Sequence, residues 1–90
     1  MGAVLVTLQA EGFSKDFSLP ADTALSDLYP RLLSALQKVD EQHAFADYTR
    51  IVLESEDGGL LNESATLADY GVRDGWYLSI ARKEKYDGIG

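Results

Sequence analysis

A run of leucines at helical spacing most constrains what this chain can fold into. Its members stand three and four residues apart on one side of a helix: Leu25, Leu28, Leu32, Leu36 and Val39. An apolar stripe of this kind has to be buried against another layer of structure. The pattern therefore predicts a helix of about four turns and requires the flanking segments to supply a sheet beneath it.

The sequence leaves the start of this helix open. Asp22 and Thr23 follow Pro20 and offer a capping oxygen, whereas Pro30 removes a backbone hydrogen bond if it lies in the interior of the helix. Either Ser26 is the cap and Pro30 lies in the first turn, or the helix begins near Thr23 and kinks.

The segments around the helix predict strands. Residues 3–9 place Val4, Val6 and Leu8 on one face, and residues 13–19 alternate in the same way after a glycine turn, so the two form a hairpin. After the helix come a polar connection at residues 37–48, a third strand at residues 50–54, and a turn at Asp57-Gly58-Gly59. A short edge strand at residues 60–61 and a last strand at residues 76–82, with Leu78 and Ile80 inward, complete the chain.

The order of these elements is strand, strand, helix, strand, short strand, strand. It predicts an α+β fold, the β-grasp, with a mixed sheet of four to five strands and one main helix packed on one face. We expect residues 1–82 to form this domain and residues 83–90 to form an extended C-terminal tail.

Three segments then resemble the ubiquitin family. Residues 66–72, Thr-Leu-Ala-Asp-Tyr-Gly-Val, are similar to that family's Thr-Leu-Ser-Asp-Tyr-(Asn/Gly)-Ile; residues 20–23 and 50–53 are similar to its Pro-Ser-Asp-Thr and Arg-Leu-Ile-Phe. Residues 67–78 most resemble the small bacterial YukD type, Leu-x-Asp-Tyr-Gly-Ile-x-Asp-Gly-Asp-x-Leu, except that Trp76 replaces an acidic residue. The resemblance covers about residues 3–82 and implies the β-grasp fold; it says less about function.

Structural roles account for the signature segment. Leu67 and Val72 can insert under the helix, and the ring of Tyr70 can pack while its hydroxyl meets backbone polar groups. Gly71 permits a backbone conformation that other residues resist. We expect none of these residues to be catalytic.

The composition argues against catalysis, metal binding and binding of nucleic acid or membranes by this chain. There is no cysteine, and the sole histidine, His43, lies in a polar segment, so we expect a surface histidine, no metal site, no cofactor and no enzyme activity. The net charge of −7 repels phosphates and anionic lipid, so nucleic acid and direct membrane binding are not expected. Without cysteines or a secretory signal, the expected location is cytoplasmic.

The resemblance to ubiquitin also implies a partner-binding surface on the outer face of the sheet. The strand positions that carry ubiquitin's apolar patch correspond to Val52, Ser79 and Ala81, of which only Val52 has a substantial apolar side chain. Trp76 and Tyr77 begin the last strand at a turn, where one of them can be exposed and anchor a partner.

The tail carries the main functional hypothesis. Resemblance implies that Gly90 is conjugated to target amines through its carboxylate, which an activating enzyme adenylates; a conjugating enzyme and a deconjugating peptidase complete such a pathway, as in bacterial ubiquitination-like operons of phage defence. Those enzymes would recognise the tail through these residues: Arg82, Lys83, Lys85, Tyr86, Gly88 and Ile89.

The alternative hypothesis is a non-conjugated YukD-type component or regulator of type VII secretion, with secretion-system subunits as partners. The two differ in the tail. Deleting Gly90 abolishes the adducts of a modifier, whereas a secretion component works without residues 83–90.

Overall fold

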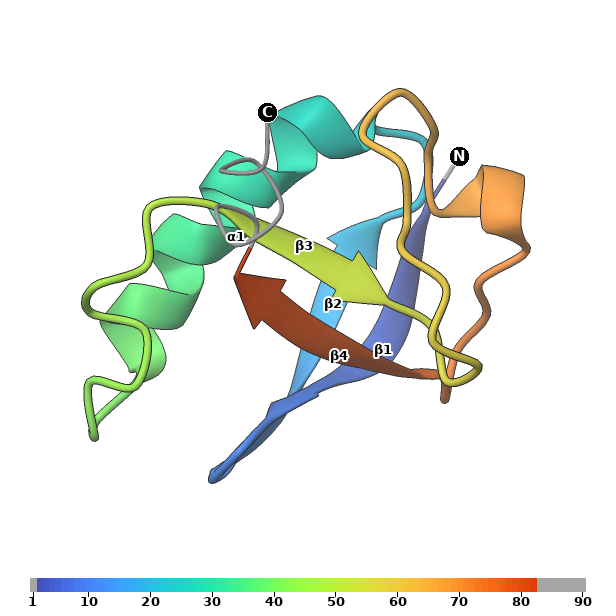
Figure 1. The fold of residues 1–90 in the computed structure, drawn as a ribbon. Coiled ribbons are helices and arrows are strands. Elements are labelled where there is room, and N and C mark those ends of the chain that lie inside the picture. Colours follow the sequence, from blue (N-terminus) through green and yellow to red (C-terminus); the bar gives the residue numbers. More distant parts are fainter. Residues whose placement is uncertain (1, 83–90) are drawn as a thin grey trace.

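A four-stranded mixed sheet carries a single long helix on one face (Figure 1). The computed structural model describes residues 2–82, with the elements β1 (Ala3–Ala10), β2 (Phe13–Pro20), α1 (Leu25–Val39), β3 (Ile51–Glu54), the 3-10 turn η1 (Ala68–Tyr70) and β4 (Tyr77–Arg82). The strand order is β2-β1-β4-β3, in which β1 and β4 are parallel and the outer pairs antiparallel. The predicted β-grasp fold is confirmed, while the short strand expected at residues 60–61 is reduced to one bridge between Glu54 and Leu60.

The N-terminal hairpin forms as predicted. β1 pairs with β2 along its whole length, so that Val4 faces Leu19 and Val6 faces Phe17 across the strands. Cross-strand partners share a face of the sheet, and this face is the one that α1 covers. Gly12 supplies the positive φ of +75° that the two-residue turn requires.

The start of α1 is close to the second alternative that the sequence left open, a helix that begins near Thr23, although it lies two residues later. The helix begins at Leu25, its N-cap residue is Ala24, and no side chain caps it, so Pro30 lies inside the helix. Instead, the Leu25 N–H donates to the Ala65 carbonyl and the Ser26 N–H to the Glu63 carbonyl, each at 2.9 Å. Backbone groups of a distant loop therefore supply the partners that the first N–H groups of a helix need.

The leucine stripe of α1 forms one side of the core. Its first four leucines are buried, but Val39 is 39% exposed because the helix ends there and the following loop takes over the covering of the sheet. Phe45, which lies in the connection expected to be polar, is 1% exposed and packs edge-to-face against Phe13 and Tyr48, with ring centroids 5.0 and 5.1 Å apart. Aromatic pairs favour this geometry.

Asp40 holds the loop that carries Phe45. Its carboxylate is buried and accepts hydrogen bonds from the backbone N–H groups of Phe45, at 2.8 Å, and Gln42, at 3.2 Å. Both bonds satisfy a charged group that would otherwise be costly to bury.

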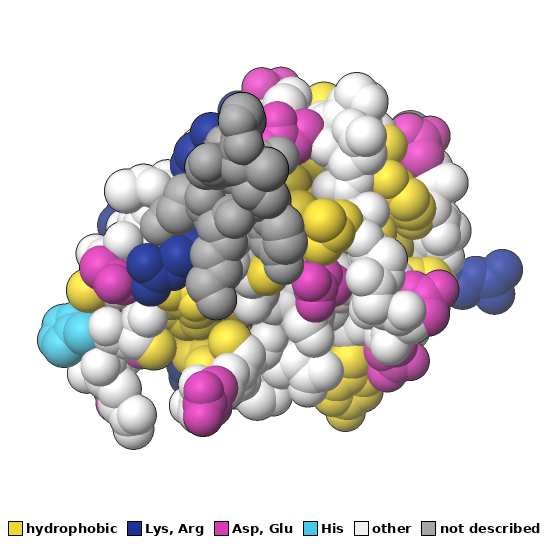
Figure 2. Space-filling model, viewed as in Figure 1, with side chains coloured by type: hydrophobic (Ala, Val, Ile, Leu, Met, Phe, Trp, Pro, Cys, Tyr) yellow, Lys and Arg dark blue, Asp and Glu magenta, His cyan; other side chains and the backbone are white. Residues whose placement is uncertain are grey.

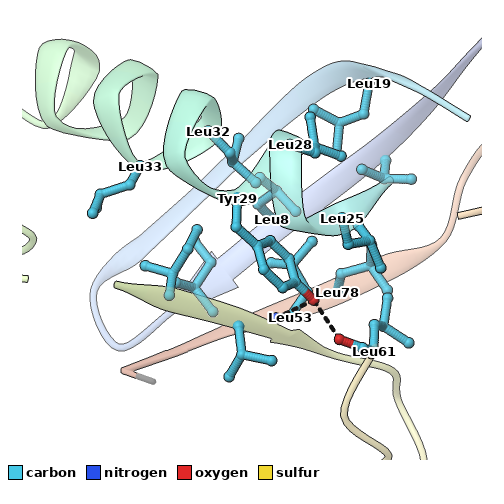
Figure 3. Packing of buried hydrophobic residues seen from close by; sticks show 14 of the residues in the cluster. Leu8, Leu19, Leu25, Leu28, Tyr29, Leu32, Leu33, Leu53, Leu61 and Leu78 are labelled. Atoms are coloured by element: carbon cyan, nitrogen blue, oxygen red, sulfur yellow. Dashed lines mark hydrogen bonds between the residues drawn. The ribbon is translucent and has the colours of Figure 1, made fainter. Parts of the chain in front are cut away.

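The hydroxyl of Tyr29 links α1 to the edge of the sheet. It donates to the Leu61 carbonyl at 2.7 Å and accepts from the Leu53 N–H at 3.2 Å, deep among buried leucines (Figure 3). Burial raises the pKa of Tyr29 to about 12, while the hydrogen bond from Leu53 acts in the opposite direction. One side chain thus joins the helix, β3 and the loop after it.

The end of β4 is fastened to the loop between α1 and β3. The Arg82 guanidinium donates to both carboxylate oxygens of Asp47, at 3.0 and 3.1 Å, and lies 4.4 Å above the centroid of the Tyr48 ring. Two hydrogen bonds from one guanidinium nitrogen and a cation–π contact together fix the direction of this side chain.

Replacing Tyr29 with phenylalanine should lower the free energy of unfolding by about 1–3 kcal/mol, because a buried carbonyl and a buried N–H lose their partner. Urea denaturation measures the change. Tyr70→Phe is the matched control: its hydroxyl accepts from the Asn62 N–H at 2.8 Å, but the residue is 38% exposed and water can replace it. Equal losses in the two variants would contradict the role given to Tyr29.

The raised pKa of Tyr29 also predicts how stability depends on pH. The neutral phenol is favoured in the folded state, so its contribution is complete below pH 10.0, the ordinary tyrosine value, and is lost as the pH rises towards about 12. The difference in unfolding free energy between the wild type and Tyr29→Phe should therefore shrink over this interval. A difference that stays constant would show that the phenol is not shifted.

The contact between Arg82 and Asp47 should contribute modestly to stability, since the two side chains are 30% and 73% exposed. A double-mutant cycle with Arg82→Gln and Asp47→Asn should give a coupling energy of about 0.5–1 kcal/mol that decreases with added salt. The pair of Arg50 and Glu63, at 3.9 Å, offers a comparison for which we expect weaker coupling.

Candidate interaction site

The outer face of the sheet is the one that α1 leaves uncovered. The strand registers assign to it, among others, these side chains: Leu5, Thr7 and Gln9 from β1, Tyr77, Ser79 and Ala81 from β4, and Val52 and Glu54 from β3. Successive residues of a strand point to opposite faces, so these positions alternate with the core residues beneath them. Four of the five partner-binding residues predicted from the sequence take outward positions: Val52, Tyr77, Ser79 and Ala81. The fifth, Trp76, precedes β4 and packs against the buried cluster.

Val52 does not offer the accessible side chain that was expected of it. It is 4% exposed, and its cross-strand partner Ala81, which packs against the buried cluster, is half-buried. Ser79 is also half-buried and pairs with Glu54. The part of the face that corresponds to ubiquitin's patch therefore exposes little apolar side-chain surface, and partner binding through it stays a prediction.

Exposed apolar side chains lie instead where β1 and β4 meet. Tyr77 is 46% exposed, whereas Trp76 is half-buried against the core, so one of the two aromatic residues is exposed, as the sequence suggested. Leu5, which the sequence did not single out, is 50% exposed. Its signal was a leucine on the face of β1 that otherwise carries polar or small residues.

Small neighbours leave Leu5 open. Its partner on β2 is Ser18. On the other side, the Leu5 N–H donates to Asp74 Oδ1 and the Leu5 carbonyl accepts from the Gly75 N–H, both at 2.8 Å. Gly75 has a φ of +93°, which favours glycine, and it has no side chain that could cover Leu5.

A shallow hollow adjoins this point. It has a volume of about 340 Å³ and is lined by Ser55, Glu56, Asp57, Gly75 and Trp76. The turn at Asp57 is ordered as predicted: Asp57 Oδ1 accepts from Ser55 Oγ and from the Gly59 N–H, and these bonds hold the pKa of the Asp57 carboxyl below its usual range. The hollow therefore presents carboxylates beside an indole.

No group of three His, Cys, Asp or Glu side chains that could hold a metal occurs within residues 2–82, and none of the helices in that range has the length and hydropathy to cross a membrane. His43 is exposed on its loop, as expected.

The predicted tail-recognition residues fall into two groups. Arg82 is the last residue of β4, and its guanidinium is engaged by Asp47 and Tyr48. The remaining members lie outside the described residues, as does the conjugation site: Lys83, Lys85, Tyr86, Gly88, Ile89 and Gly90.

Comparison with known proteins places the chain in a secretion context. Residues 3–80 match the family described as the YukD protein of the WXG100 protein secretion system (Wss). A search of curated proteins finds no match. This family is described as part of a secretion system, so the comparisons favour the alternative hypothesis over conjugation.

Several solved structures share the fold. The ubiquitin-like domain of the Mycobacterium tuberculosis type VII secretion system protein ECCD1 is 19% identical, with a TM-score of 0.73 over 90% of this chain and 99% of that one. The EccD5 ubiquitin-like domain from Mycobacterium xenopi is 23% identical, with a TM-score of 0.72 over 90% and 94%.

A chain of the MycP5-free ESX-5 inner membrane complex is 30% identical, with a TM-score of 0.71 over 90% of this chain but only 21% of that one. The present chain thus spans about a fifth of that subunit. With a family match over residues 3–80 and a ubiquitin-like fold throughout the described residues, the chain belongs to the YukD family, which is tied to type VII secretion.

Proposed function

We propose that this chain is a non-catalytic, cytoplasmic component or domain of a type VII secretion system that works by binding other protein subunits of that system. The observation that carries the proposal is the match of residues 3–80 to the YukD family of the WXG100 secretion system. Family membership alone does not name a partner, so the mode of action is argued from the surface of the domain.

The similar structures support a role in assembly. This fold covers 21% of a chain in the ESX-5 inner membrane complex and 16% of a chain in the ESX-3 core complex. In those assemblies a ubiquitin-like domain is one part of a larger subunit. A small domain with one covered and one open sheet face is suited to holding neighbouring subunits in position.

The chemistry of the described residues agrees with binding. Tyr29, whose phenol has a strongly raised pKa, lies in the core. Asp57, whose carboxyl pKa is lowered, lies in an exposed turn. Perturbed groups that gather in a cleft point to catalysis; here the two lie apart, and each has a structural explanation.

Deleting the gene should reduce export of a WXG100 protein, measured by immunoblotting of culture supernatant against the cell fraction. The full chain should restore export. A chain that ends at Arg82 should restore it equally, because we propose that the folded domain binds the other subunits. Export that is unchanged by the deletion would overturn the proposal.

A separate measurement distinguishes conjugation. If the chain modifies other proteins, antibodies against it should detect species heavier by 9.9 kDa, the mass of the chain, that disappear when Gly90 is deleted. The proposal expects no such species. Their appearance, together with normal export, would favour the modifier hypothesis.

A further inference from the structure

We propose that Leu5, Glu56, Asp57, Trp76 and Tyr77 form one docking surface, the Leu5–Tyr77 surface, that binds a partner-protein segment carrying an arginine or lysine next to an apolar residue. The inference rests on the proposed function, because it specifies where the domain contacts another protein. It assigns the contact to the seam of β1 and β4 and not to the positions that correspond to ubiquitin's patch.

The five residues are contiguous through the backbone. Thr7 pairs with Tyr77 in register, and the Thr7 N–H donates to the Trp76 carbonyl at 2.9 Å, so β1 and β4 are in contact at this point. Gly75, which lines the hollow with Glu56, Asp57 and Trp76, donates to the Leu5 carbonyl. The hollow and the exposed apolar residues therefore adjoin one another at Gly75.

The apolar part of the surface consists of two neighbouring side chains. Leu5 and Tyr77 are 50% and 46% exposed, and they come from adjacent strands on the same face. Single exposed hydrophobic residues are ordinary, whereas exposed apolar residues that gather and are rimmed by polar groups mark interaction sites. Trp76 adds a third apolar side chain at the edge of the hollow.

The negative charge around the hollow favours a partner segment that is positively charged. Between residues 51 and 81 there are six acidic residues and one basic residue, Arg73. Glu56 makes no hydrogen bond or ion pair with any part of residues 2–82, and the bonds to Asp57 end on Oδ1, which leaves Oδ2 open. Figure 2 shows acidic side chains scattered among hydrophobic ones on one face of the molecule. The carboxylates of Glu56 and Asp57 attract a cationic segment and repel an acidic one.

The hollow suits a guanidinium or ammonium group in particular. A cation beside the Trp76 indole can contact the ring while it faces the carboxylates of Glu56 and Asp57. A planar guanidinium stacks on aromatic faces and bonds carboxylates with two parallel N–H groups, so arginine should bind more tightly than lysine. An aliphatic neighbour on the same segment would cover Leu5 and Tyr77.

A nuclear magnetic resonance titration of the full, isotope-labelled chain tests this surface. The probe is the peptide Gly-Ser-Leu-Arg-Leu-Arg-Leu-Ser-Gly, and the control peptide has glutamine in place of both arginines. The arginine peptide should shift the signals of the five surface residues, including the Trp76 indole N–H, and the glutamine peptide should not. Equal shifts with both peptides, or shifts confined to other residues, would overturn the inference.

Charge variants sharpen the test. Glu56→Gln combined with Asp57→Asn should weaken binding of the arginine peptide about three- to tenfold, as expected for two exposed charge pairs. The matched control, Glu11→Gln with Glu41→Gln, makes the same change in net charge at exposed residues outside the surface and should retain the wild-type affinity. Equal weakening in both double variants would reduce the effect to net charge and contradict the docking surface.

A variant of one exposed apolar residue tests the apolar part of the surface without unfolding the protein. Leu5→Ser alters a half-exposed residue, so it should keep the urea midpoint close to that of the wild type while it weakens peptide binding. Unchanged binding in a folded Leu5→Ser protein would show that Leu5 takes no part.

The secretion assay separates failure of this inference from failure of the proposed function. If the gene deletion abolishes export and Glu56→Gln with Asp57→Asn restores it fully, the docking surface fails while the secretion role stands. If the deletion leaves export intact, the secretion role fails and the titration alone decides whether the surface binds basic segments.

Discussion

The fold depends on backbone hydrogen bonds between the start of α1 and the loop that follows β3. The first N–H groups of the helix, from Leu25 and Ser26, donate to the carbonyls of Ala65 and Glu63 because no side chain caps them. The same loop keeps its shape through reciprocal bonds between Thr66 and Asp69. The residues that complete the helix start therefore directly precede the signature segment, residues 66–72, in which Leu67 is fully buried at 0% exposure.

In this arrangement the two faces of the sheet have different roles. The helix, the signature loop and Phe45 bury one face, which supplies the stability of the domain. The other face combines a region around Val52 and Ala81 that exposes little side-chain surface with two exposed apolar residues at the seam of β1 and β4, Leu5 and Tyr77.

Periodicity was sufficient to predict what depends on local pattern. The alternation of Val4, Val6 and Leu8 and the stripe of α1 identified the strands, the helix and their buried sides. Features that depend on distant segments of the chain could not be predicted from the sequence. Phe45 is a lone aromatic residue in a polar stretch, the partners of the helix start lie about 40 residues away along the chain, and the exposure of Leu5 follows from the small size of Ser18 and Gly75 beside it.

The parallel pairing of β1 and β4 has a mechanical consequence. β1 starts at Ala3 and β4 ends at Arg82, at opposite ends of the pair, and the strands run side by side in register. Tension applied across these two points must slide one strand along the other, so that the bonds between them, including those from Leu5 to the turn at Gly75, are loaded together and not opened in turn. A pair of strands loaded in this way resists tension better than a pair whose bonds open in turn.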